Sequence, residues 1–425
     1  MVHPFSVLLG KTVRHIARLR GGSGSALPGL FVEKIDPQFI RRTLNSLPQG
    51  VVLVSGTNGK TTTTKMVVEL LEGQGLKVFT NRTGSNFTRG VAAALLGDIS
   101  LSGKLDADIA VLELDEAHAV HFVRAIAPRH TLLLNVMRDQ LDRFGEIDYT
   151  AKLLKTIAEA TIDTVTLNRE DARVRSIAKH LPKSVDVNYF GLSKHLLKHF
   201  PNDEDLHGVS SAKESKLPAD VELTKFDETS ATFHIDGKNH TVSLKLTGIY
   251  NIFNASAALA TVRHILGEDI DQEKLLETLA NIMPAFGRGE TLSINGQPLE
   301  LILVKNPSGF RLGLSSFSPE GYETMIAIND NYADGRDMSW LWDVSFESLK
   351  KTGVAMVSGA RCYDMALRLQ YDEVIAKSAT DNLSTALQQF IDNYPNSPKR
   401  IYCTYTAMLA IRRELATMTD VKEID

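Results

Sequence analysis

The strongest chemical signal in the sequence is a glycine-rich stretch that follows the apolar run 51–54. Glycines let backbone N–H groups approach phosphate oxygens, and the start of a following helix adds partial positive charge. Lys60 would bring a cation to the terminal phosphates, and Thr61 would offer its hydroxyl to Mg²⁺. The general phosphate-loop pattern would place its first glycine at Val54, so this loop is a shorter variant. The residues expected to bind a nucleotide are Gly56, Thr57, Asn58, Gly59, Lys60, Thr61 and Thr62.

A carboxylate that could complete the metal site ends a later apolar run, 109–114. In open α/β sheets, the carboxyl end of a neighbouring parallel strand lies beside the ligand crevice. We therefore expect Glu113 to bind Mg²⁺ or to hold a water on it, and to act with Lys60 in catalysis. Glu116 and His118 are secondary candidates, although His118 could equally be an ordinary polar helix residue.

These groups need a sheet to position them, and the pattern of apolar runs predicts one. Short buried-strand candidates alternate with helical patterns, which is typical of a parallel sheet with right-handed crossovers. Asp236-Gly237 and Asn295-Gly296 each predict a hairpin turn. The predicted strands are 51–54, 77–80, 109–114, 130–136 and 164–168, and then 323–328, 353–359, 372–376 and 400–405.

The order of these patterns predicts an α/β protein with three regions. Residues 1–48 form a basic, helical N-terminal extension. Residues 49–290 form a central parallel-sheet domain that binds ATP, interrupted at about 190–230 by a polar stretch that we interpret as an insertion or long loop. Residues 291–425 form a smaller Rossmann-like α/β domain.

Composition limits the class of protein. The chain has 425 residues, with 47 Lys+Arg against 51 Asp+Glu, and a net charge of -4 argues against a protein that coats nucleic acid. There is no apolar run of about 18 residues, as a membrane-spanning helix would need. The first apolar run, 5–9, is too short for a signal peptide and is followed, not preceded, by basic residues. We expect a cytoplasmic protein with at most peripheral membrane contact.

At this point the chain resembles the Mur ligases, whose relatives include the folylpolyglutamate synthases. The resemblance rests on SGTNGKTT, ELDEA, NVMRDQLDRFG (135–145), TLNREDA (166–172), GIYNIFNASAA (248–258) and FGRGE (286–290). It implies that ATP phosphorylates a carboxylate and that an amine then attacks the acyl phosphate.

The C-terminal third is similar to one branch of this family, the MurT-type subunits. The matching stretches are KNPSGF (305–310), residues 328–347 and VSGAR (357–361). The resemblance implies amidation of the α-carboxyl of D-glutamate in the stem peptide of lipid II. It also implies a heterodimer with a GatD-type glutaminase that supplies ammonia. A soluble precursor in place of lipid II stays open as the substrate.

The resemblance also assigns roles to single residues. Asn251 and Asn254 would lie near adenine, unless they only cap a helix, and Arg288 would contact the nucleotide, unless it forms a surface ion pair. Asp337 would complete the glutaminase's catalytic triad, with Asp343 as the alternative. The residues that would face the lipid-linked substrate are Asn81, Gly84, Ser85 and Asn86.

Two departures from the family pattern matter. Many amidating relatives carry four cysteines in the middle domain, but residues 190–230 contain none, so no zinc site is expected. Other Mur ligases have a histidine where this chain has Gln140, and they carbamylate a lysine. Tyr149 and Lys152 have the spacing of that element, so carbamylation of Lys152 stays open against an ordinary helix lysine.

The source of nitrogen divides the remaining hypotheses. Glutamine hydrolysis normally needs an activated cysteine, and neither Cys362 nor Cys403 lies in a glycine-flanked nucleophile turn. One hypothesis is therefore a synthetase that works with a separate glutaminase chain. The alternatives are a stand-alone Mur or folylpolyglutamate-type ligase that uses a free amino acid, and a nucleotide-binding protein without catalysis. The presence of Lys60, Thr61 and Glu113 argues against the last.

Overall fold

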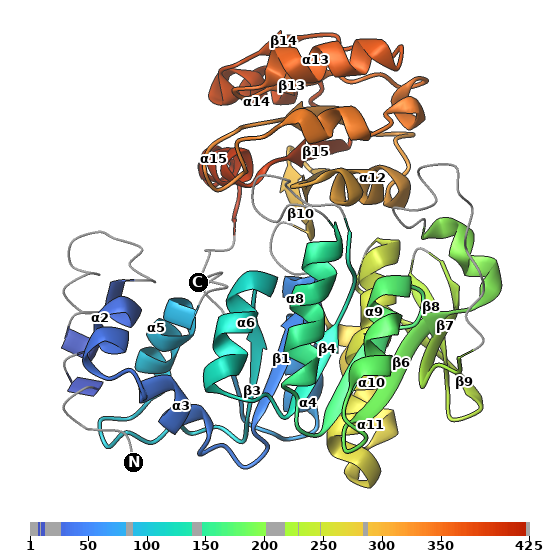
Figure 1. Cartoon of the computed structure of the whole chain (residues 1–425). Coiled ribbons are helices and arrows are strands. Elements are labelled where there is room, and N and C mark those ends of the chain that lie inside the picture. The colour runs from blue at the N-terminus through green and yellow to red at the C-terminus, as the bar shows by residue number, and fades with distance from the viewer. Residues whose placement is uncertain are drawn as a thin grey trace.

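The chain folds into two α/β units, one stacked above the other in Figure 1. The structure is a computed structural model that describes residues 7–8, 10–12, 27–81, 88–137, 147–200, 217–227, 229–246, 248–283 and 288–421. Gly84, Ser85, Asn86, Gln140 and the N-terminal helix predicted around 13–20 lie outside the described residues. No helix among the described residues is both long and apolar enough to cross a bilayer.

The central unit is built on a nine-stranded sheet with the order β2-β3-β1-β4-β5-β6-β7-β8-β9. Pairing is parallel from β2 to β7 and antiparallel from β7 to β9. The first strand in the chain lies between β3 and β4, so the chain winds outward from β1 in both directions. The strands are β1 Val51–Ser55, β2 Val78–Thr80, β3 Ile109–Glu113, β4 His130–Leu133, β5 Thr164–Asn168, β6 Asp186–Leu192, β7 Val221–Phe226, β8 Ser230–Ile235 and β9 Lys238–Ser243.

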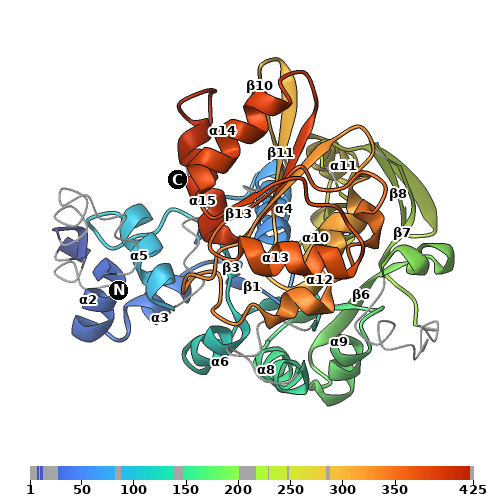
Figure 2. The same cartoon turned by 90° about the horizontal axis from the view of Figure 1, so that it is seen from above.

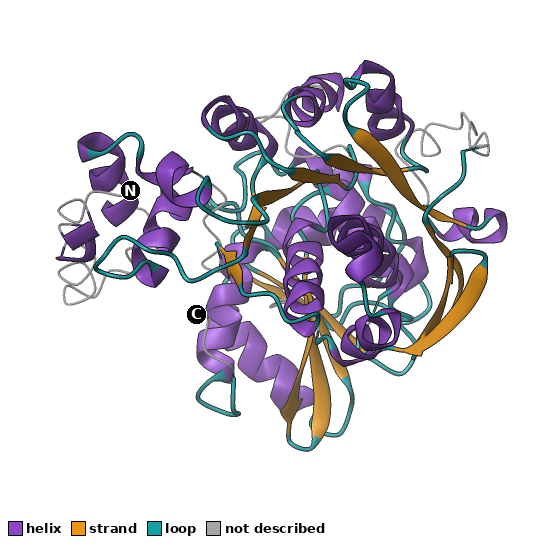
Figure 3. Ribbon diagram, turned by 90° about the horizontal axis from the view of Figure 1, so that it is seen from below, coloured by secondary structure: helices purple, strands orange, loops and turns teal. Residues whose placement is uncertain are grey.

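Helices cover both faces of this sheet, as Figure 3 shows from below. One face carries α4 (Lys60–Gly73), α10 (Ile249–Leu266) and α11 (Gln272–Asn281). The other carries α6 (Glu116–Ala125), α8 (Ile147–Glu159), α9 (Ala172–Ser176) and the 3₁₀ helix η1 (Ile177–His180). Beside the sheet, α5 (Thr88–Asp98) packs against α6, and α2 (Leu27–Ile35) and α3 (Phe39–Leu44) pack against α5. Further 3₁₀ turns are η2 (Lys194–His199) and η4 (Gly267–Asp269).

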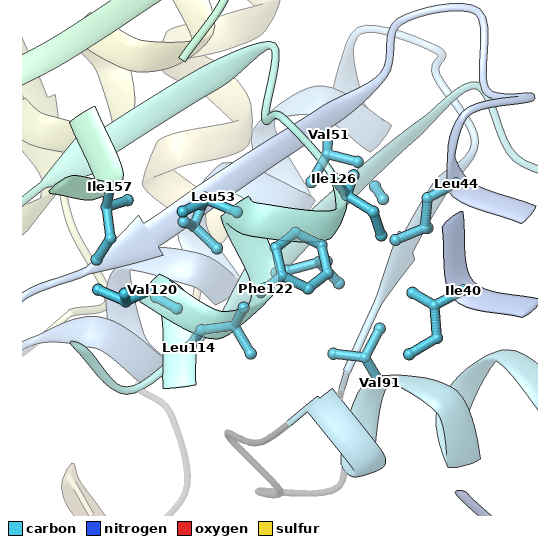
Figure 4. Close-up of a cluster of buried hydrophobic side chains, with 14 of the residues drawn as sticks. Ile40, Leu44, Val51, Leu53, Val91, Leu114, Val120, Phe122, Ile126 and Ile157 are labelled. Carbon is cyan, nitrogen blue, oxygen red and sulfur yellow. The ribbon is translucent and has the colours of Figure 1, made fainter. Parts of the chain in front are cut away.

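The two-sided burial explains why β1 is apolar at successive positions. Side chains alternate across a strand, so Val51 and Leu53 pack in the core on the α5–α6 side, whereas Val52 and Val54 pack against α4 and α10. Figure 4 shows Leu53 and Val51 near Phe122 of α6 and Ile126, the residue after α6, in the first of these cores. The carboxyl end of β1, where the phosphate loop starts, is thus anchored from both faces.

The C-terminal unit, residues 288–421, has a six-stranded sheet with the order β10-β11-β15-β12-β13-β14. Only the β10–β11 pair is antiparallel. Helices α12 and α13 cover one face, and α14 and α15 the other. The elements are β10 Arg288–Ile294, β11 Gln297–Leu303, α12 Pro307–Ser316, β12 Glu323–Ala327, η5 Ser339–Asp343, η6 Glu347–Leu349, β13 Met356–Ser358, α13 Cys362–Tyr371, β14 Ala379–Thr380, α14 Leu383–Asn393, β15 Lys399–Cys403 and α15 Tyr405–Leu415.

The predicted hairpin turns are confirmed. Asp236 and Gly237 have φ angles of 48° and 77° between β8 and β9, and Asn295 and Gly296 have φ angles of 54° and 76° between β10 and β11. Two positive φ angles are the signature of the type I′ turn that such pairs favour.

Two predictions about elements are wrong. Residues 372–376 form no strand, because Asp372 ends α13 by accepting the Phe346 N–H and pairing with Arg368, and Glu373 adopts a φ of 57°. Only an isolated bridge at Ala376 joins Val354 before β14 begins. For the stretch 190–230, the long-loop alternative is wrong, since β6, η2, β7 and the first residue of β8 occupy parts of it, whereas the insertion stays a prediction.

Phe310 of α12 should be a main source of stability in the C-terminal unit. Its ring is fully buried and packs against Trp340, Phe346 and Tyr402, with ring centroids 6.3, 5.0 and 5.5 Å away. Phe310→Ala should lower the free energy of unfolding of this unit by about 3–5 kcal/mol through lost contacts and a cavity. Urea unfolding followed by tryptophan fluorescence measures this directly, because both tryptophans, Trp340 and Trp342, lie in η5.

Tyr332→Ala is the matched control, since the Tyr332 side chain is 80% exposed and its removal should change stability by less than about 0.5 kcal/mol. Equal unfolding midpoints for the two variants would contradict the assignment of Phe310 to the core.

Candidate functional site

The phosphate loop connects β1 to α4 through a backbone turn that requires glycine. Gly59 is the residue before α4 and has a φ of 89°, in the left-handed region. A Cβ atom on Gly59 would lie 2.7 Å from the side-chain amide nitrogen of Asn254. Gly56 has a φ of 133° and packs against the backbone of Asn135. The loop backbone is therefore closely enclosed, which is the cradle that phosphate binding needs.

Asn135, which follows β4, holds this loop in shape. Its side-chain oxygen accepts the Asn58 N–H at 2.9 Å, and its side-chain amide donates to the Asn58 carbonyl at 2.9 Å. Its own carbonyl accepts the Thr57 N–H at 3.0 Å. Sequence reasoning did not single out Asn135. The signal that could have found it is an asparagine just after a buried strand adjacent to β1.

Thr61 and Glu113 meet as expected for a metal site. The Thr61 hydroxyl donates to Oε1 of Glu113 at 2.9 Å, because β1 and β3 are parallel neighbours and Val54 pairs with Glu113. These oxygen donors fit Mg²⁺, which typically takes one or two protein oxygens and completes its shell with water and substrate phosphates. Nowhere in the described residues do three or more His, Cys, Asp or Glu side chains gather into a metal-binding group.

Asn81, at the end of β2, fixes the backbone of Glu113. Its amide nitrogen donates to the Glu113 carbonyl at 2.8 Å, and its oxygen accepts the Glu113 N–H at 3.0 Å. Asn81 is only 6% exposed. A direct contact between Asn81 and substrate stays a prediction, whereas its bonds to Glu113 position the acid.

Lys60 is buried and lies among acceptors. Its ammonium donates to the carbonyls of Gly56 and Thr57, the latter at 3.3 Å, and lies 3.6 Å from Oε2 of Glu116. Glu116 is the first residue of α6 and is itself buried. Glu116, predicted as a secondary site residue, thus lies beside Lys60. His118, the other secondary candidate, is half-buried on α6.

A pocket opens between the two units beside the loop. From the central unit it is lined by Asn58, Gly59, Asn135, Met137, Gly248, Tyr250, Asn251 and Asn254. The C-terminal unit contributes Ile302, Leu303, Lys305, Gly309, Leu312, Gly313, Ser316 and Phe317. Asn251 and Asn254 are in the first two turns of α10, next to the loop, as the nucleotide assignment requires. An apolar wall with a few amide groups beside a phosphate loop suits a nucleoside.

The C-terminal unit also bonds directly to the loop, which sequence reasoning missed. The Asn306 amide donates to Oδ1 of Asn58 at 3.2 Å, and the Lys305 ammonium donates to the Thr57 carbonyl at 3.1 Å. Figure 2 shows the C-terminal unit from above, lying over β1 and α4. Arg288 begins β10, where its backbone pairs with Ile302.

Asp337 lies apart from this pocket, in the segment between β12 and η5. Its carboxylate accepts the Ser339 N–H at 2.9 Å and is half-buried. Bonds from the Ser339 side chain and backbone hold the pKa of Asp337 below its usual range, so it stays ionised at neutral pH. The Asp343 carbonyl accepts a bond from Arg311.

Neither cysteine is placed to act as a nucleophile. Cys362 and Cys403 are fully buried, and burial raises the pKa of the Cys362 thiol. A reactive thiol needs exposure and a lowered pKa. Lys152 is exposed on α8.

The fold is that of the Mur ligases. MurF from Acinetobacter baumannii superposes with a TM-score of 0.69 at 17% identity, covering 90% of this chain and 79% of that one. Folylpolyglutamate synthase from Mycobacterium tuberculosis, solved with ADP and AMPPCP, superposes with a TM-score of 0.63 at 15% identity, covering 99% of this chain and 100% of that one. These likenesses establish the fold.

Sequence comparison identifies the branch. The Mur ligase middle domain matches residues 54–262, and the MurT ligase C-terminal domain matches residues 303–408. The chain is 32% identical to the lipid II isoglutaminyl synthase (glutamine-hydrolyzing) subunit MurT of Streptococcus pneumoniae over 98% of both chains. The Staphylococcus aureus (strain COL) subunit is 28% identical over 87% of this chain and 88% of its own. The chain therefore belongs to the MurT family.

Gly59→Ala should weaken nucleotide binding without unfolding the chain. The added methyl group would collide with Asn254, and alanine does not readily adopt a φ of 89°. We expect affinity for ADP, measured by calorimetry, to fall by more than about tenfold.

Gly237→Ala is the control, because Gly237 also has a positive φ but no neighbour lies within 4 Å of its Cβ position. It should bind ADP as the unmodified chain does. Normal ADP binding by the Gly59→Ala variant would contradict the placement of phosphates in this loop.

Proposed function

We propose that this chain is the synthetase subunit of a glutamine-dependent enzyme that amidates the α-carboxyl of D-glutamate in the stem peptide of lipid II. The family and the subunit names of its relatives support this function. The observation that carries it is a phosphate loop with Lys60, Thr61 and Glu113 in one chain whose cysteines are both buried. Such a chain can activate a carboxylate but needs nitrogen from elsewhere.

The first step is phosphoryl transfer. A carboxylate oxygen of the substrate attacks the γ-phosphorus of ATP, the bond to the β,γ-bridging oxygen breaks, and ADP leaves with that electron pair. Lys60 and the loop N–H groups would neutralise charge on the phosphate oxygens. Bound Mg²⁺ at Thr61 and Glu113 would supply further charge neutralisation.

The second step forms the amide. Ammonia attacks the acyl carbon, the bond to the phosphate oxygen breaks, phosphate leaves with that electron pair, and the nitrogen loses a proton. Phosphate is a far better leaving group than the hydroxide that an unactivated acid would have to expel. The site must therefore exclude water, which would otherwise hydrolyse the acyl phosphate. Residues of both units, among them Asn251, Asn254 and Phe317, line the pocket beside the loop, so both units could help to exclude water.

The partner would be a GatD-type glutaminase with its own cysteine. Ammonia released there from glutamine would pass to this chain. Lipid II would be met at the inner surface of the membrane.

ATP turnover with the lipid-linked peptide should depend on the nitrogen source. We expect it to require glutamine plus the glutaminase subunit, or a high concentration of ammonium without it. Phosphate release and mass spectrometry of the peptide measure the reaction, and the amidated product should be lighter than the acid by about one mass unit. Lys60→Met should remove turnover under both conditions, since both need the phosphate loop.

A stand-alone ligase is the second candidate, because the superposed Mur enzymes include MurF and a folylpolyglutamate synthase. It predicts equal turnover with a free amino acid and no second subunit. That result would refute the proposed amidation.

Asp337 should matter only when glutamine is the nitrogen source. We infer that its carboxylate, which is half-buried and lies apart from the pocket between the units, reaches the active site of the glutaminase. Asp337→Asn should then reduce glutamine-dependent turnover by at least about 100-fold, as expected for loss of a triad acid. Ammonium-dependent turnover should be unchanged.

Asp343→Asn, tested in parallel, decides between the two assigned aspartates. If Asp343→Asn alone gives the selective loss, the role belongs to Asp343. An equal loss with both nitrogen sources would show that Asp337 supports the fold or the synthetase site instead.

A further inference from the structure

The side-chain amide of Asn306 joins the C-terminal unit to the phosphate loop. Asn306 is fully buried and precedes α12, where its Oδ1 accepts the Gly309 N–H at 2.7 Å. Its Nδ2 donates to Oδ1 of Asn58 at 3.2 Å. One side chain therefore caps a helix of the C-terminal unit and binds a loop residue of the central unit. The segment 305–306 is fixed to the loop more firmly than a surface contact would be.

This anchor brings a second lysine to the loop. The ammonium of Lys305 donates to the Thr57 carbonyl at 3.1 Å, and the ammonium of Lys60 lies 3.3 Å from the same oxygen. Two cations that share one neutral acceptor repel each other and raise the positive potential at that point. Lys305 also lines the pocket between the units, as Asn58 and Gly59 of the loop do.

The ligand that suits this arrangement is a polyphosphate. Lys60 and the loop N–H groups suffice to bind a single phosphate group. A triphosphate carries further negative charge on its γ-phosphate, which needs another cation. Transfer of the γ-phosphoryl group spreads charge over its equatorial oxygens, and a cation placed there lowers the barrier. Lys305 comes from the other unit, so it can be present only when that unit is seated on the loop.

We propose that Lys305 is a phosphate-binding residue of the C-terminal unit that contacts the γ-phosphate of bound ATP. This inference rests on the proposed ATP-dependent function. During transfer, the ammonium of Lys305 would move from the Thr57 carbonyl to an oxygen of the transferred γ-phosphoryl group. The covalent steps are unchanged, since Lys305 keeps its proton throughout.

Nucleotide binding tests the assignment without the partner or the lipid substrate. Calorimetry with ADP and with a non-hydrolysable ATP analogue, both with Mg²⁺, gives the affinity ratio. Lys305→Met should lower the affinity for the ATP analogue by about tenfold or more and the affinity for ADP much less, because only the γ-phosphate loses a charged partner. Lys305→Arg should restore most of the preference.

Lys305→Gln separates the effect of the positive charge from that of the hydrogen bond between the units, because glutamine can still donate to the Thr57 carbonyl. It should lose the preference for the ATP analogue as Lys305→Met does. Lys351→Met is the matched control, since Lys351 pairs with Glu320 on the surface of the same unit. It should leave both affinities unchanged, and melting temperatures establish that each variant is folded.

An equal loss of affinity for ADP and for the ATP analogue in Lys305→Met would show that Lys305 only holds the units together, and would overturn the assignment. So would an unchanged affinity ratio. An unmodified chain that binds neither nucleotide would overturn the proposed function, and this inference with it. An altered ratio in the Met and Gln variants but not in the Arg variant supports the inference.

Discussion

Residues 56–59 form a turn whose shape is maintained by asparagine side chains from three other segments. Asn135 bonds the backbone of Asn58, Asn306 bonds its side chain, and Asn254 fills the space that a larger residue at Gly59 would need. An amide can donate and accept at once, so each asparagine can satisfy groups on two sides of a crowded loop. The turn therefore also joins the two units, because Asn135 and Asn254 belong to the central unit and Asn306 to the C-terminal one.

The buried ion pair between Lys60 and Glu116 follows from the same enclosure. Removing both charges from water is costly, and a separation of 3.6 Å recovers only part of that cost. Carbonyl oxygens of Gly56 and Thr57 supply the rest of the surroundings of the ammonium. The pair therefore contributes less to stability than to keeping a cation where phosphates bind. Glu116 can hold Lys60 in place because α6 begins directly beside the end of β3.

The sequence alone predicted the parts of the site that are local in the chain. The phosphate loop, the carboxylate at the end of β3 and both type I′ hairpins depend on neighbouring residues, and the structure contains all of them. Asn135, Asn306 and Lys305 were missed, because their importance comes from contacts across 77 to 248 residues of chain. The strand predicted at 372–376 failed for a related reason. Its apolar residues favoured extension, but Asp372 bonds Phe346 and Arg368 and ends α13 there.

The proposed division of the chemistry between two chains has a physical basis in this fold. An acyl phosphate must be shielded from water, and the pocket beside the loop has walls from both units. A glutaminase thiolate needs an exposed site that admits glutamine and water. Those demands conflict within one pocket, and both cysteines here are buried among apolar side chains. A chain that keeps its own thiols inert and accepts ammonia from a second subunit satisfies both demands.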